Sequence, residues 1–188
     1  MKTIKFTLLA TLTLLFFTAC ENDNNPDPVN EEEVITTLTA RFTPQGGGNA
    51  VTLMYRDLDG DGPNDPTITV SGNFANGTVY SGSIELLNET ETPAEDITEE
   101  IQEEDDEHQF FYALANSDIA MVTYTDEDGD GNPVGLTVDM ETTARGTTTL
   151  TMTLRHEPNK NASGVSDGNI ANAGGETDIE VTFTITVE

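Results

Sequence analysis

Two short acidic loops contain the residues best suited to bind a hard cation. The first is Asp57-Leu58-Asp59-Gly60-Asp61-Gly62 and the second is Asp126-Glu127-Asp128-Gly129-Asp130-Gly131. Each loop carries carboxylates at alternate positions and a glycine at the sixth, which supplies oxygens to a calcium ion and permits a sharp turn. The acidic twelfth residue of an EF-hand is replaced by Ile68 or Thr137. We therefore predict calcium-stapled turns of a β-protein, with plain solvated hairpin turns as the alternative. The predicted ligands are Asp57, Asp59, Asp61, Asp65, Asp126, Asp128 and Asp130.

A second acidic run, residues 99–107, is followed by a histidine. Acidic side chains at the end of a helix oppose the helix dipole, and a bound cation would relieve that conflict. His108 adds an imidazole nitrogen, a ligand suited to zinc, copper or iron. The natural partner is His156, because the chain contains two histidines. The alternative is that both histidines and the charge run simply face solvent.

The sequence shows no pattern typical of an enzyme. It lacks a recognisable nucleophile with a base, a phosphate-binding loop and a cysteine–histidine metal cluster. A hydrolase built on two carboxylates stays open as an alternative, because 35 acidic residues always provide some suitable pair. The formal net charge of −28 predicts repulsion of nucleic acid and attraction of cations.

The elements that must position these residues are strands. Apolar residues alternate with polar ones, many of them threonine, and glycine, proline and asparagine turns separate the runs. This pattern predicts an all-β fold, an antiparallel β-sandwich, and lacks helical crossovers. The predicted strands cover 38–42, 51–55, 68–70, 80–86, 110–114, 120–124, 136–140, 150–154 and 179–187.

The sandwich is expected to consist of two sequence-similar halves. Each half contains one aspartate loop, and the segment 83–89 aligns with 151–157 at nearly the same separation from it. One short acidic helix is predicted between the halves, capped at Thr92 with Pro93 in its first turn. The run 157–176, rich in asparagine and glycine, is predicted to be a poorly ordered or functional loop.

The N-terminal residues are typical of an exported lipoprotein. Lys2 and Lys5 precede an apolar stretch and the one cysteine, Cys20, and this leader is too short to span a bilayer. Lipidation of Cys20 would anchor the chain to the membrane, and loss of the two lysines would change the net charge from −28 to −30. An ordinary signal peptide is the alternative. The predicted divisions are a signal peptide at 1–20, an acidic flexible tether at 21–33 and the duplicated β-sandwich at 34–188.

The chain resembles a group of small lipoproteins of Flavobacteria and other Bacteroidota. The likeness lies in the segments 96–101, 106–112 and 175–183 and spans most of the mature chain. Members are often labelled "type 1 periplasmic binding fold superfamily protein", although the two-lobed α/β architecture in that label conflicts with the period-two pattern here. The resemblance implies a location on the outer membrane, at the cell surface or the periplasmic face, beside a TonB-dependent receptor that imports a scarce nutrient. It also implies Glu107, His108 and His156 as metal ligands.

These observations predict a non-enzymatic, lipid-anchored protein that binds divalent cations or a scarce nutrient. A structural or adhesive surface module with solvated acidic loops is the alternative.

Overall fold

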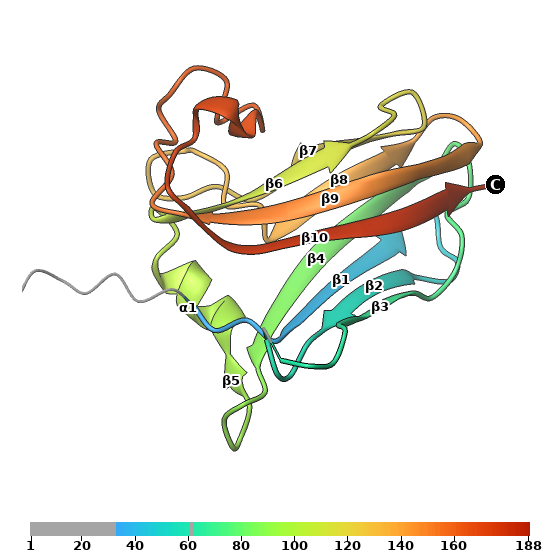
Figure 1. Ribbon diagram of the computed structural model, residues 1–188. Helices are drawn as coiled ribbons and strands as arrows, with labels where there is room; N and C mark the ends of the chain where they lie inside the picture. Colours follow the sequence, from blue (N-terminus) through green and yellow to red (C-terminus); the bar gives the residue numbers. More distant parts are fainter. Residues whose placement is uncertain (1–32, 61) are drawn as a thin grey trace, which may run out of the picture. The chain divides into compact units, whose positions relative to one another are not determined.

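Ten β-strands, one α-helix and a 3-10 turn make up the described part of the chain, residues 33–60 and 62–188 of the computed structural model (Figure 1). The predicted signal peptide with Cys20, residues 21–32 of the tether, and Asp61 lie outside the described residues. No helix within the described ranges has the length and apolar character needed to cross a membrane. The elements are β1 (Thr37–Pro44), β2 (Val51–Arg56), β3 (Thr67–Val70), β4 (Val79–Asn88), β5 (Glu95–Asp96), α1 (Ile97–Glu103), β6 (His108–Leu114), β7 (Ala120–Tyr124), β8 (Thr137–Thr142), β9 (Gly146–His156), η1 (Ile170–Asn172) and β10 (Glu176–Val187).

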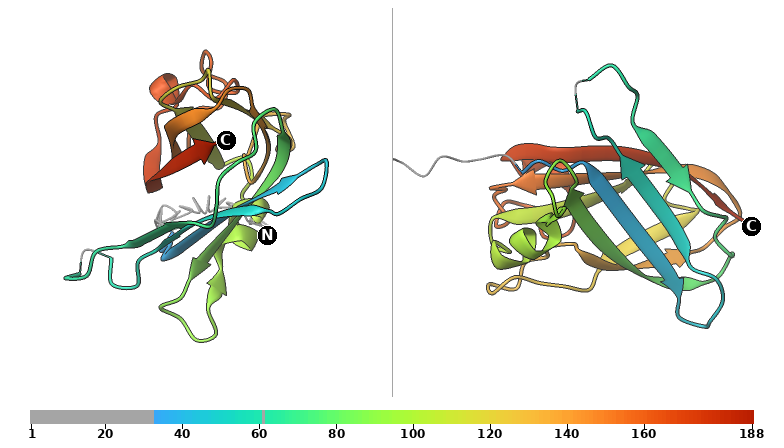
Figure 2. Two further views of the ribbon diagram at one scale, coloured as in Figure 1. Left: turned by 90° about the vertical axis from the view of Figure 1, so that its right-hand side faces the viewer. Right: turned by 90° about the horizontal axis from the view of Figure 1, so that it is seen from below.

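The strands form two antiparallel sheets. The larger sheet has the order β3-β2-β1-β4-β8-β7, with β5 paired to β4, and the smaller sheet has the order β10-β9-β6. Figure 1 and Figure 2 show β1, β2 and β3 as a layer apart from β9 and β10, while the larger sheet bends so that β7 and β8 lie on the side of β6. The predicted all-β sandwich is therefore confirmed.

The core lies between the two sheets and is built from the alternating apolar residues. On the larger sheet, Leu38 and Phe42 of β1 are fully buried, and on the smaller sheet Leu150, Met152 and Leu154 of β9 are fully buried. Their polar neighbours face outward because successive strand residues point to opposite faces. At one end of the sandwich Phe74 lies edge-on to Phe42, with ring centroids 5.7 Å apart.

The two halves share much of their strand pairing. In the first half β1 pairs with β4 and β2 pairs with β3, and in the second half β6 pairs with β9 and β7 pairs with β8. The halves differ in that β1 also pairs with β2, whereas β6 and β7 lie in different sheets. Repetition in the sequence therefore corresponds to repetition in topology, with the second half divided between the two layers.

The predicted start of the acidic helix is corrected. The short acidic helix lies between the halves as predicted, but it begins at Ile97 and its N-cap is Asp96, whose side chain accepts the Thr98 N–H. Residue Glu95 instead pairs with β4, so the predicted cap at Thr92 is wrong.

The segment between β9 and β10 is ordered rather than loose. Val165 and Ala173 are fully buried and pack against Phe111 on the outer face of β6. This segment and α1 lie at the same end of the sandwich, opposite the C terminus (Figure 1). The histidines lie at this end as well, at the start of β6 and the end of β9.

Candidate metal centre

The two histidines are direct cross-strand partners. His108 opens β6 and His156 closes β9, and they pair in register with ring centroids 4.5 Å apart. Each histidine continues the inward row of its strand, two residues from Phe110 and from Leu154 respectively. Both are therefore buried, with side-chain exposures of 0% and 6%. The prediction that they are partners is confirmed in position, and the alternative of solvent-exposed histidines is wrong.

Two carboxylates from distant segments complete the cluster. Glu33 precedes β1 and has a side chain that is 4% exposed, although the sequence placed it at the end of the flexible tether. Asp178 lies in β10 at the point where the register with β9 shifts between Thr177 and Ile179. A β-bulge of this kind redirects a side chain, and the Asp178 side chain is fully buried beside His156.

Four donor atoms of Glu33, His108, His156 and Asp178 all lie within 4.8 Å of one another. Nε2 of His108 is 2.8 Å from Oε1 of Glu33, and Nδ1 of His156 is 3.5 Å from Oε2 of Glu33 and 3.9 Å from Oδ1 of Asp178. Two ligands at ~2.1 Å from a tetrahedral zinc ion lie ~3.4 Å apart. The observed spacing therefore suits one such ion with small adjustments.

Two of these buried atoms lack a hydrogen-bond partner. They are Oε2 of Glu33 and Nδ1 of His156, which face each other at a distance beyond normal hydrogen-bond length. Buried polar atoms are rarely left unpaired, because removing them from water without a partner is costly. A cation between them would satisfy both atoms.

Both ring nitrogens of His108 face acceptors. Nδ1 lies 3.1 Å from the carbonyl oxygen of Glu104, and Nε2 contacts Glu33. Burial opposes a charge on His108, but the hydrogen bond and negative charge of Glu33 outweigh it, so the His108 pKa is raised. Burial likewise opposes ionisation of Glu33, and contact with His108 outweighs it and lowers the Glu33 pKa. Without metal, the two groups therefore form a buried ion pair.

The same arrangement prepares His108 to bind a metal through Nε2. Histidines that ligate metals usually donate their other ring N–H to a carbonyl or carboxylate, which fixes the ring orientation. The carbonyl of Glu104, the C-cap residue of α1, fills this role for Nδ1. Helix α1 thus positions the ligand, and the histidine is a second partner of this helix-end carbonyl, which also accepts the Glu107 N–H.

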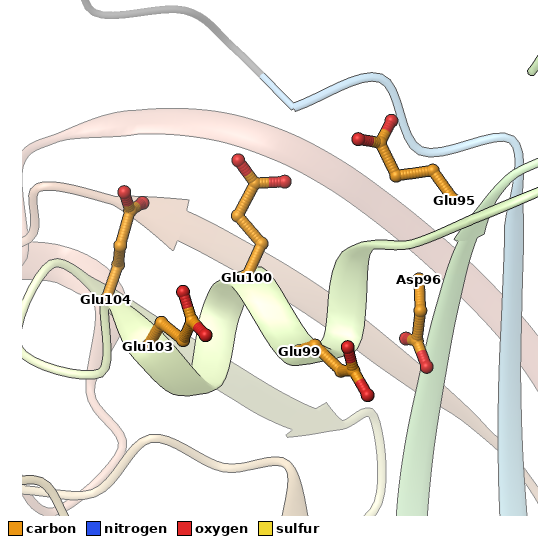
Figure 3. Close-up of a pocket in the computed structure, with 6 residues that line it drawn as sticks. All are labelled: Glu95, Asp96, Glu99, Glu100, Glu103 and Glu104. Atoms are coloured by element: carbon orange, nitrogen blue, oxygen red, sulfur yellow. The ribbon is translucent and has the colours of Figure 1, made fainter.

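An open acidic pocket lies along helix α1. Figure 3 shows Glu100 and Glu104 directed to one side of the helix, and Glu99 and Asp96 directed to the other. Partial burial and then the charges of Glu33, Glu104 and Glu95 raise the pKa of Glu100. The pocket adds negative potential near the histidines. Its lining residues are Glu95, Asp96, Glu99, Glu100, Glu103 and Glu104.

The first aspartate loop is held by local hydrogen bonds. Asp57 accepts the backbone N–H of Asp59, and Asp59 accepts the side-chain amide of Asn64 at 2.5 Å. Asp65 is exposed in the same loop. Calcium binding here stays a prediction, since Asp61 lies outside the described residues.

In the second loop the carboxylates already have other partners. Asp126 accepts N–H groups of Gly135 and Thr137 through its two oxygens, and Asp128 forms a buried ion pair with Lys160 at 2.9 Å. Burial opposes the charge on Asp128, but Lys160 and backbone N–H groups outweigh it and lower the Asp128 pKa. Asp130 is exposed, and among the described residues these three aspartates form no joint cluster of donor atoms.

Sequence reasoning identified part of the cluster. It named His108 and His156, but not Glu33 or Asp178. Glu107, also named, lies on the solvent side of His156, with Oε2 3.8 Å from Nε2. One signal in the sequence indicated their burial: each histidine lies two residues from an apolar residue of the inward-facing row of its strand.

Comparison with known proteins assigns the chain to no family. No protein-family model and no curated protein matches the chain. One similar solved structure is the crystal structure of the S-layer protein SbsC domains 4 and 5, with 12% identity over 79% of this chain and 75% of that chain and a TM-score of 0.29. A similarity at this level supports no functional argument. The described residues thus define a β-sandwich with a buried histidine–carboxylate cluster.

Proposed function

We propose that the protein is a non-enzymatic, membrane-anchored lipoprotein that binds a divalent transition-metal ion, with zinc as the best fit. The observation that carries the proposal is the buried convergence of Glu33, His108, His156 and Asp178. Two imidazoles with two carboxylates suit zinc in a tetrahedral site. The two unpaired atoms between the ligands are the part of the cluster that an ion would satisfy.

A site of this composition favours binding over catalysis. Catalytic zinc sites keep a coordination position open for water or substrate, whereas four protein ligands close the coordination sphere. The ligand side chains are at most 6% exposed, so a substrate would have little access. Capture of a scarce metal for a TonB-dependent receptor is the role we propose, with Cys20 as the lipid anchor on the outer membrane.

The acidic surface supports the capture of cations. The chain has a formal net charge of −28, and the pocket around α1 lies beside the carbonyl that orients His108. A concentration of one charge sign raises the local concentration of counter-ions and their rate of binding. Calcium at the first aspartate loop stays a separate prediction, and loss of calcium binding heat in Asp59→Asn would test it.

Calorimetry with zinc tests the proposal. The wild-type protein should bind one zinc ion, and Glu33→Gln and His108→Gln should each weaken binding at least tenfold, as loss of even outer-shell partners does. Glu85→Gln, on an exposed face of β4, is the matched control for the lost charge and should bind as the wild type does. Absence of zinc binding by the wild type would overturn the proposal.

A structural surface module is the second candidate, and the Glu33–His108 ion pair favours it. This pair joins residues 75 positions apart and holds the start of the sandwich against β6 without any metal. On this reading Glu33→Gln lowers thermal stability, and neither zinc nor a chelator changes the melting temperature.

A further inference from the structure

The two ring nitrogens of His156 face two different sets of acids. Nδ1 faces the buried carboxylates of Glu33 and Asp178, whereas Nε2 faces Glu107. The side chain is 6% exposed, so the ring forms the boundary between the interior and the solvent. One imidazole thus offers a ligand atom to each side.

The solvent side contains a second group of donor atoms. Glu107, His156 and Glu157 each offer one atom, and these lie within 4.8 Å of one another. Glu107 has a side chain that is 51% exposed and Glu157 is also exposed. The Glu157 backbone N–H donates to the Glu107 carbonyl at 2.7 Å, which holds the two acids side by side.

The backbone at this point is closely packed. Glu157 has φ of 49°, in the left-handed region that a side chain disfavours. Across from it, a Cβ at Gly175 would overlap the carbonyl oxygen of His156, so only glycine permits the close approach of the two chain segments. The outer group therefore belongs to a fixed part of the fold.

We propose that Glu107, Glu157 and Nε2 of His156 form an exposed loading site, through which the metal ion reaches and leaves the buried site. This inference rests on the proposed function, because it assumes that the buried site binds zinc. The buried ligands are at most 6% exposed and need a route for the ion. The outer group provides one, since it shares a ligand residue with the inner group and lies in contact with solvent.

Imidazole chemistry makes the two sites mutually exclusive. A neutral imidazole has one lone-pair nitrogen and one N–H, so His156 holds an ion on one side at a time. When the ion binds Nδ1, the proton lies on Nε2 and faces the Glu107 carboxylate, an arrangement that commonly supports metal-bound histidines. Glu107 thus acts as a metal ligand when the ion occupies the outer group and as the hydrogen-bond acceptor of Nε2–H when the ion occupies the inner group.

Stopped-flow measurement of zinc binding, and of zinc release to a chelator, tests the loading site on the full chain. Glu157→Gln should slow both steps about tenfold, the lower end of the effect of local charge on association, and leave the dissociation constant unchanged. Glu107→Gln should slow both steps and also weaken affinity about tenfold, because it removes the acceptor for Nε2–H. Glu85→Gln on β4, an exposed acid outside both groups and outside the acidic pocket, controls for net charge.

The outcomes separate the two proposals. Zinc binding by the wild type with unchanged rates in Glu157→Gln and Glu107→Gln overturns the loading site and leaves the proposed function intact. Absence of zinc binding by the wild type overturns both. Glu157→Gly provides a second variant that removes the carboxylate and suits the positive φ, so its slower kinetics would support the loading site without a folding defect.

Discussion

Zinc should raise the melting temperature of the protein, and the effect should depend on Glu33. The four ligands come from four segments, and Glu33 and His108 are 75 residues apart, so the unfolded chain cannot assemble the site. A ligand that binds only the folded state at 100 times its dissociation constant stabilises it by about 2.7 kcal/mol. For a chain of this size, such a gain corresponds to a rise in melting temperature of roughly 5–10 °C.

Glu33→Gln should remove most of this rise. If the substitution weakens zinc binding by about 10–100-fold, the same zinc concentration stabilises the variant by only about 0.4–1.4 kcal/mol. Differential scanning calorimetry measures each variant with zinc and with a chelator, so that each is compared with its own metal-free state. Glu85→Gln should keep the full rise with zinc, whereas any rise caused by calcium at the aspartate loops should not depend on Glu33. An equal rise in wild type and Glu33→Gln would refute the assignment of the site.

Three further outcomes follow from the same contacts. Without metal, the contribution of His108 to stability is present below about pH 6.5 and is lost as pH rises through its raised pKa. The contribution of Glu33 is present above about pH 4.5 and is lost as pH falls through its lowered pKa. Urea unfolding should therefore show their joint contribution to be greatest between these pH values, and His108→Gln should flatten the profile. Lys160→Met should destabilise the fold by about 3–5 kcal/mol in the same assay, because it leaves the Asp128 carboxylate buried without its ion-pair partner. A loss of stability below about 1 kcal/mol, which is typical of a surface ion pair, would contradict this expectation. Phe183→Ala should cost about 3–5 kcal/mol, since the ring is fully buried in the core, and retention of wild-type stability would place it outside that core.

The sequence predicted the fold because the signal is local and repeated. Eight of the nine predicted strands lie within observed ones, and the ninth, 136–140, begins one residue before β8, since alternation over a few residues already specifies which side of a sheet is buried. The helix boundary was less accurate, because Glu95 takes part in pairing with β4, a contact that propensity cannot anticipate. The 157–176 segment appeared loose from its composition, yet Val165 within it is fully buried against Phe111.

The sequence by itself determined the strands, the acidity and the positions of both histidines in the inward rows of their strands. The tertiary structure alone decided which acids meet them. Glu33 lies in a segment with tether-like composition, and Asp178 turns inward because the register shifts beside it. It also decided that Lys160 meets Asp128 in the second aspartate loop. Such contacts join residues far apart in the chain, so they depend on how the sheets pack and on a single irregularity in one strand, neither of which a local pattern records.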